Sequence, residues 1–128
     1  MNTPRWIGRD ECLAIHEMLL ARHGGTAGVR DEALLQQALA QPRDKWAADC
    51  TSLPALAACY ATAIVTSHPF VSGNNCTGFL VATTFLGVNG LVFTGRGVPT
   101  VEETLALARG DSPEAFYGLF LKCNSRAP

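Results

Sequence analysis

The chain has 128 residues, of which 48% are hydrophobic and 16% charged, and its ten Lys and Arg residues face eleven Asp and Glu residues. This length favours one domain, residues 1–128, with a single hydrophobic core. The apolar content excludes an intrinsically disordered chain, and the near-neutral charge without a basic run argues against nucleic-acid binding.

The five cysteines are odd in number and form no CxxC pair: Cys12, Cys50, Cys59, Cys76 and Cys123. This pattern predicts neither a disulfide framework nor a metal site, and it favours the reducing cytoplasm. No charged residue lies between Asp49 and Arg96. The apolar stretches within that segment are shorter than the about 20 residues of a membrane span, so we expect buried helices and no membrane association.

The first half of the chain predicts two helices. Asp10 and Glu11 suit the first turn of a helix that ends before Gly24, with apolar residues three and four positions apart. Two histidines in this helix, His16 and His23, are interpreted as a surface residue and a helix end. A second helix is predicted over 32–40, between a capping aspartate and Pro42, followed by a polar loop over 43–52 that carries Trp46.

The second half predicts four more helices. Pro54 opens one that runs to about Ser67, and the next spans about 75–88. Residues 91–93 could form a short strand or an extended connector. A capping box at Thr100–Glu103 opens a fifth helix, and Pro113 opens a sixth. This order predicts an all-α bundle of about six helices with at most one short β segment.

The candidate catalytic and binding residues lie in one segment, residues 68–78. Its sequence is His-Pro-Phe-Val-Ser-Gly-Asn-Asn-Cys-Thr-Gly. A histidine leaves one helix and a Gly-Asn turn enters the next. The backbone N–H groups of residues 74–77 should lack partners within their own helix, and such a helix start binds anions such as phosphate. Gly73 permits the backbone conformation that such a cradle needs.

This segment resembles the signature of the Fic/Doc family, which reads His-Pro-Phe, any residue, Asp or Glu, Gly-Asn, Lys, Arg, Thr. Further segments are similar to its short Doc ("death on curing") branch: residues 14–17, 23–25, 28–31, 41–43, 84–86, 89–90 and 103–105. The resemblance covers nearly the whole chain and implies a helical Fic-type bundle.

The resemblance implies a nucleotide-dependent transferase that uses ATP with Mg²⁺. Larger members transfer the adenylyl group of ATP to a protein hydroxyl. The Doc branch phosphorylates elongation factor Tu, which stops translation, and a partner antitoxin neutralises it. By the same resemblance, His68 is the general base, Phe70 a buried anchor, and Gly73 and Asn74 the phosphate cradle. The loop around 43–46 would hold the target-docking flap.

Three positions depart from the family signature. Ser72 replaces the acidic residue that holds magnesium, whereas Asn75 and Cys76 replace the lysine and arginine that bind phosphates. Phosphoryl transfer depends on neutralising charge on the phosphate oxygens, and one lost donor costs about 10²–10³ in rate. We therefore expect a weak or inactive enzyme.

The sequence is compatible with three functional hypotheses: an impaired Doc-like toxin, a catalytically dead Fic-fold module that binds a partner such as the antitoxin, and an active adenylyltransferase. Natural loss and deliberate replacement of the three residues would leave the same sequence. Cys76 is either a reactive thiol, since a helix start favours the thiolate, or a small filler where arginine was lost.

Overall fold

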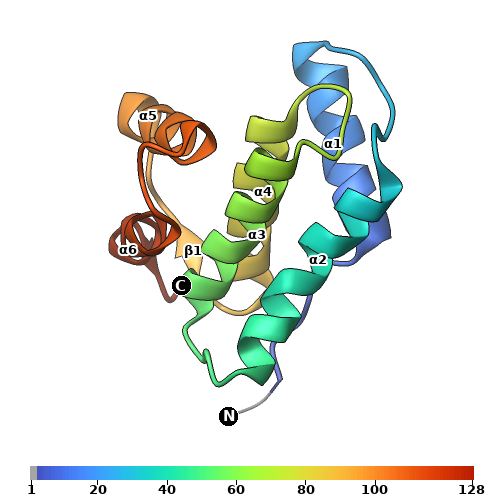
Figure 1. The fold of residues 1–128 in the computed structure, drawn as a ribbon. Helices are drawn as coiled ribbons and strands as arrows, with labels where there is room; N and C mark the ends of the chain where they lie inside the picture. The colour runs from blue at the N-terminus through green and yellow to red at the C-terminus, as the bar shows by residue number, and fades with distance from the viewer. Residues whose placement is uncertain (1–2) are drawn as a thin grey trace.

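The computed structural model describes residues 3–128, and the predicted all-α bundle is confirmed for that range (Figure 1). Its six helices are α1 (Arg9–His23), α2 (Glu32–Ala47), α3 (Leu53–Ser67), α4 (Asn74–Val88), α5 (Gly97–Arg109) and α6 (Glu114–Cys123). A two-stranded antiparallel sheet joins β1 (Val92–Phe93) to β2 (Ser125–Arg126). Residues 91–93 thus contain a short strand.

Helix α3 is the centre of the bundle and packs against α2, α4, α5 and α6. The hydroxyl of Ser52 accepts a hydrogen bond from the N–H of Ala55 and so caps the start of α3. Helix α4 approaches α3 closely at Gly78, where an added Cβ would lie 2.7 Å from Cγ1 of Val65. Helices α3 and α4 therefore pack closely side by side, and the loop that joins them lies at one end of the pair (Figure 1).

Helix α2 is longer than the sequence predicts. It runs through Pro42 to Ala47, so the expected loop over 43–52 is wrong for its first half. Proline in a helix removes one backbone hydrogen bond and costs about 3 kcal/mol. Burial of Pro42 and edge-to-face packing of Trp46 on Trp6, with ring centroids 6.1 Å apart, favour the continued helix and offset that cost. Both tryptophans are thus packing residues.

Helices α5 and α6 lie together on the other side of α3 (Figure 1). The predicted capping box is wrong, because α5 begins at Gly97 and no side chain caps it. Pro99 falls in the first turn, where a missing N–H costs nothing, and this allows the earlier start. A buried hydrogen bond joins α5 to α6, where the hydroxyl of Thr104 lies 2.9 Å from the hydroxyl of Tyr117.

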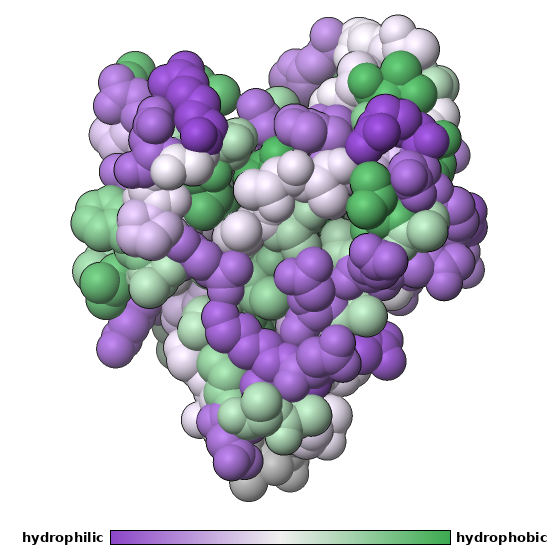
Figure 2. Space-filling model, in the orientation of Figure 1, coloured by the Kyte–Doolittle hydropathy of each residue, from purple (hydrophilic) through white to green (hydrophobic). Residues whose placement is uncertain are grey.

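Hydrophobic surface gathers in the hollow between α5 and the central helices, whereas hydrophilic residues cover much of the rest of this face (Figure 2). Within residues 3–128, no helix is both long and apolar enough to cross a membrane. The charge-free stretch between Asp49 and Arg96 instead supplies the two central helices, and most of α3 is buried.

Candidate functional site

The segment that carries the candidate chemistry forms the loop from α3 to α4, at the top of the view in Figure 1. His68 ends α3 in a left-handed conformation with φ 52°, and its side chain is exposed. Phe70 is 1% exposed and anchors the loop in the core, as expected. Gly73, with φ 78°, turns the chain into α4. A left-handed conformation at this position favours glycine.

A second segment, residues 24–31, lies alongside this loop and holds its backbone. Val29 pairs with Phe70 in an isolated antiparallel bridge. The Arg30 guanidinium donates hydrogen bonds to the carbonyl oxygens of Ser67 and His68, at 2.8 and 2.7 Å. These contacts satisfy carbonyl groups left open at the end of α3 and place a cation at the negative end of its dipole. Arg30 thereby fixes the backbone of His68.

The Asn74 side chain closes the loop from within. Its Oδ1 accepts a hydrogen bond from the N–H of Phe70, and its Nδ2 donates to the carbonyl oxygen of Phe70, both at 3.0 Å. This amide is therefore committed to loop structure. A phosphate bound at this position would therefore contact the backbone N–H of Asn74 and not its side chain.

A pocket of about 350 Å³ lies at the start of α4 and is lined by His68, Gly73, Asn74, Asn75 and Cys76. The N–H groups of residues 74–76 make no hydrogen bond within the part of the chain that the structure describes. The N–H of Thr77 donates to the carbonyl oxygen of Gly73 at 3.0 Å, so the predicted set of free donors is one residue too long. Three free donors and the positive end of the helix dipole suit an oxyanion.

Ser72 does not line this pocket. Its Oγ accepts a hydrogen bond from the N–H of Thr26 at 2.8 Å and donates to the carbonyl oxygen of Thr26 at 3.1 Å. The side chain at the signature's acidic position is thus engaged with the neighbouring segment.

The pocket residues do not fit a magnesium ion. None of the five residues that line the pocket carries a carboxylate, and none is a lysine or arginine. Across residues 3–128, no group of three or more His, Cys, Asp or Glu side chains could hold a metal. Magnesium prefers carboxylate and phosphate oxygens. The backbone donors suit phosphate oxygens, but the site supplies no ligand set for the metal.

His16 contradicts the sequence interpretation, which placed it on the surface. It is 3% exposed, and its ring lies parallel to that of Phe70, with centroids 3.9 Å apart. Its Nε2 lies 2.9 Å from the carbonyl oxygen of Ser72. The available signal was its position four residues after Cys12, on the apolar stripe of α1. By contrast, His23 ends α1 and is exposed, as expected.

The loop expected around 43–46 is wrong, because these residues are helical, and a role for them in target docking stays a prediction. The non-helical connection between α2 and α3 is confined to residues 48–52.

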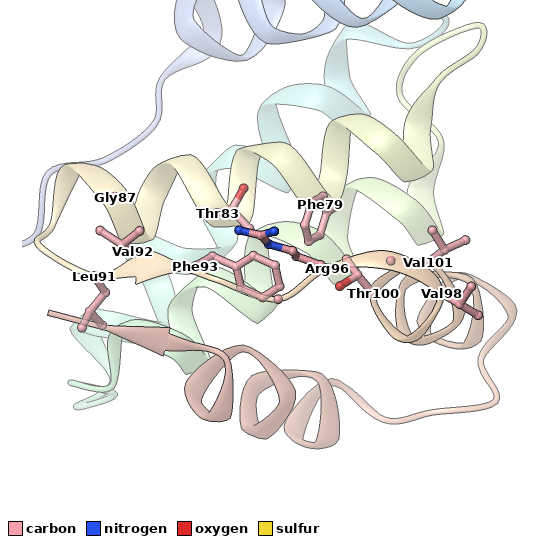
Figure 3. Close-up of a pocket in the computed structure, with 12 residues that line it drawn as sticks. Phe79, Thr83, Gly87, Leu91, Val92, Phe93, Arg96, Val98, Thr100 and Val101 are labelled. Carbon is pink, nitrogen blue, oxygen red and sulfur yellow. The ribbon is translucent and has the colours of Figure 1, made fainter. Parts of the chain in front are cut away.

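Sequence reasoning assigned no role to a second, larger pocket of about 830 Å³ between α4, β1 and α5 (Figure 3). Phe79 and Phe93 line it with their rings 5.4 Å apart, and Arg96 extends across it. A smaller pocket of about 190 Å³ shares Phe79 with this groove and Cys76 with the pocket at the start of α4. Apolar surface thus begins beside the candidate site.

The fold and the site together define a helical domain with a pocket at a helix start, where backbone N–H groups without a partner in residues 3–128 lie beside an exposed histidine. The sequence profile of the Fic/DOC family matches residues 6–86, more than half of the chain, so the protein belongs to the Fic/DOC family. The matched range covers α1 to α3, the loop and most of α4. No curated protein matches the chain.

Proposed function

We propose that the protein is a Doc-like toxin component of a toxin–antitoxin pair whose phosphotransferase site is impaired. The observation that carries this proposal is the pocket at the start of α4. It combines His68 and three free backbone donors with the neutral side chains of Asn75 and Cys76, at two of the three positions where the family signature is charged.

Each retained group has a defined task in this proposal. The free N–H groups of residues 74–76 bind oxygens of a nucleotide phosphate, aided by the dipole of α4. The exposed imidazole of His68 takes the proton from an acceptor hydroxyl as that oxygen attacks the γ-phosphorus of ATP, and ADP leaves as the bond between the γ-phosphorus and the bridging oxygen breaks. Arg30 holds the His68 backbone in place for this step.

The missing charges set the expected rate. No lysine or arginine among the pocket residues neutralises the transferred phosphoryl group, and Ser72 is bonded to Thr26. Mutagenesis of single electrostatic donors in enzymes costs about 10²–10³ in turnover. We therefore expect ATP to bind weakly, with little dependence on magnesium, and transfer to be slow.

The partners in this proposal follow from the family and from the Doc-like segments of the sequence. They are elongation factor Tu as the phosphorylated target and a cognate antitoxin as the inhibitor, both in the cytoplasm. A second function, a binding module without catalysis, is supported by the same neutral pocket. It differs from the first by an absence of phosphate transfer at any enzyme concentration.

Titration calorimetry with ATP, in magnesium and in EDTA, tests the proposal. We expect weak binding that is similar in both buffers and is lost in competition with excess inorganic phosphate. Tight binding that requires magnesium would contradict it. Incubation with radiolabelled ATP and candidate target proteins then distinguishes the functions. Label transferred from the γ-phosphate supports the kinase, label from the α-phosphate supports an adenylyltransferase, and no label supports the binding module.

A further inference from the structure

His16 lies on the buried side of the loop, beneath the turn that begins α4. An added Cβ on Gly73 would lie 3.7 Å from its Nε2, so the imidazole sits directly against this turn. The ring stacks on Phe70 with an interplanar angle of 11°. His16 does not line the pocket itself.

The contact with Ser72 assigns the tautomer of the imidazole. A carbonyl oxygen can only accept a hydrogen bond, so Nε2 of His16 must carry the proton and donate it at 2.9 Å. The carbonyl of Ser72 is thereby held toward α1.

The geometry of the peptide group carries this orientation to the next residue. No peptide bond among the described residues is cis. In a trans peptide, the carbonyl and the following N–H point to opposite sides. Because the Ser72 carbonyl points toward His16, the N–H of Gly73 points away from it, and this N–H makes no hydrogen bond within residues 3–128. Gly73 also lines the pocket.

We propose that His16 is a positioning residue for the oxyanion site. By donating to Ser72, it turns the N–H of Gly73 into the pocket and adds a fourth donor to those of residues 74–76. A left-handed residue followed by a helical one, as at Gly73 and Asn74, forms the concave array of N–H groups that binds anions. The inference rests on the proposed function in taking phosphate as the ligand.

Two variants separate the donor from the ring. His16→Phe keeps an aromatic ring over Phe70 but has no donor, whereas His16→Gln keeps an N–H donor but loses the ring. Inorganic phosphate is titrated into each ¹⁵N-labelled protein, and the amide signals of Gly73 and residues 74–76 are followed by NMR. Loss of one donor to a charged ligand should weaken binding about 10-fold or more in His16→Phe. His16→Gln should stay within about threefold of the wild type and restore the shift of the Gly73 signal.

Either of two results overturns the inference. The first is that folded His16→Phe binds phosphate as the wild type does. The second is that His16→Gln loses as much affinity as His16→Phe, since a purely structural role would depend on the ring. Thermal melting of each variant verifies its fold.

Two measurements on the wild-type protein test the role of His16 if His16→Phe does not fold. They also apply if phosphate does not bind and the proposed function fails. The imidazole ¹⁵N spectrum of this protein should show Nε2 of His16 protonated. Its Gly73 amide should exchange rapidly with water. An unprotonated Nε2 or a protected Gly73 amide would overturn the assignment without reference to any ligand.

Discussion

Ser72 and Thr26 exchange two hydrogen bonds, one in each direction, between the serine hydroxyl and the threonine backbone. This pair joins the loop between α3 and α4 to the segment between α1 and α2. At the position where the family signature is acidic, the protein has a side chain that both donates and accepts. A carboxylate can only accept, so it could not make both bonds.

Replacing Ser72 with alanine should lower the free energy of unfolding. Each of the two hydrogen bonds contributes about 0.5–1.5 kcal/mol, so the loss should be about 1–3 kcal/mol in urea denaturation. Ser112→Ala serves as the control, because the Ser112 side chain makes no hydrogen bond within residues 3–128. Equal stability of the two variants would show that the contact with Thr26 contributes nothing.

Replacing Arg30 should lower the free energy of unfolding more than replacing an ordinary exposed arginine. Arg30→Ala removes two charge-assisted hydrogen bonds to the end of α3, and we expect a loss of about 1–3 kcal/mol in stability. Arg30→Lys should recover only part of it, because an ammonium group lacks the planar fork that reaches two carbonyls. Chemical denaturation of both variants checks this expectation, with Arg22→Ala as an exposed control from α1. A lysine variant as stable as the wild type would argue against the two-pronged contact.

The two tyrosines of the chain should resist ionisation while the protein is folded. Burial raises the pKa of Tyr60 and of Tyr117 to about 12, against a usual value near 10. Ultraviolet absorbance of tyrosinate should therefore show no step near pH 10 until the protein unfolds.

The same pKa shifts set the direction of the stability change. The unfolded chain loses the tyrosine protons at lower pH than the folded chain, so it binds fewer protons above pH 10. The free energy of unfolding should then fall as pH rises from about 10 toward 12. Denaturation midpoints in urea across this range measure the fall, and a constant midpoint would contradict the burial of both hydroxyls.

Local sequence signals predicted most of the helix boundaries. Asp31 does cap α2, and Gly24 does end α1, because these residues act on their own turn. The failure at the end of α2 has a tertiary cause. Packing of Trp46 on Trp6 carries α2 past its proline, and no pattern within that segment reports the partner.

The candidate site was predictable where its residues are consecutive. Residues 68–76 form one loop and one helix start, so their order places them together. His16 and Arg30 come from another part of the chain and donate to backbone carbonyl groups of this loop, whereas the backbone of Thr26 bonds to the hydroxyl of Ser72. Every residue has the same backbone groups, so a hydrogen bond to the backbone cannot be recognised from the sequence. The structure was needed to identify these supporting residues.

Restoring the signature's charges tests the proposed impairment directly. Ser72→Asp, Asn75→Lys and Cys76→Arg are combined, because groups that act on one transition state are not additive and single changes can have no visible effect. The acidic residue must break the exchange with Thr26, so we expect the triple variant to be less stable than the wild type. Circular dichroism verifies that it still folds.

The decisive measurement is growth after induction without an antitoxin, with phosphorylation of elongation factor Tu assayed in the same cells. We expect the triple variant to arrest growth and modify the factor, and the wild type to be far less toxic. Adding His68→Ala should abolish both effects, since the attacking hydroxyl would lose its base. A folded triple variant that permits normal growth and leaves elongation factor Tu unmodified would contradict the proposal that this site is an impaired Doc-like phosphotransferase.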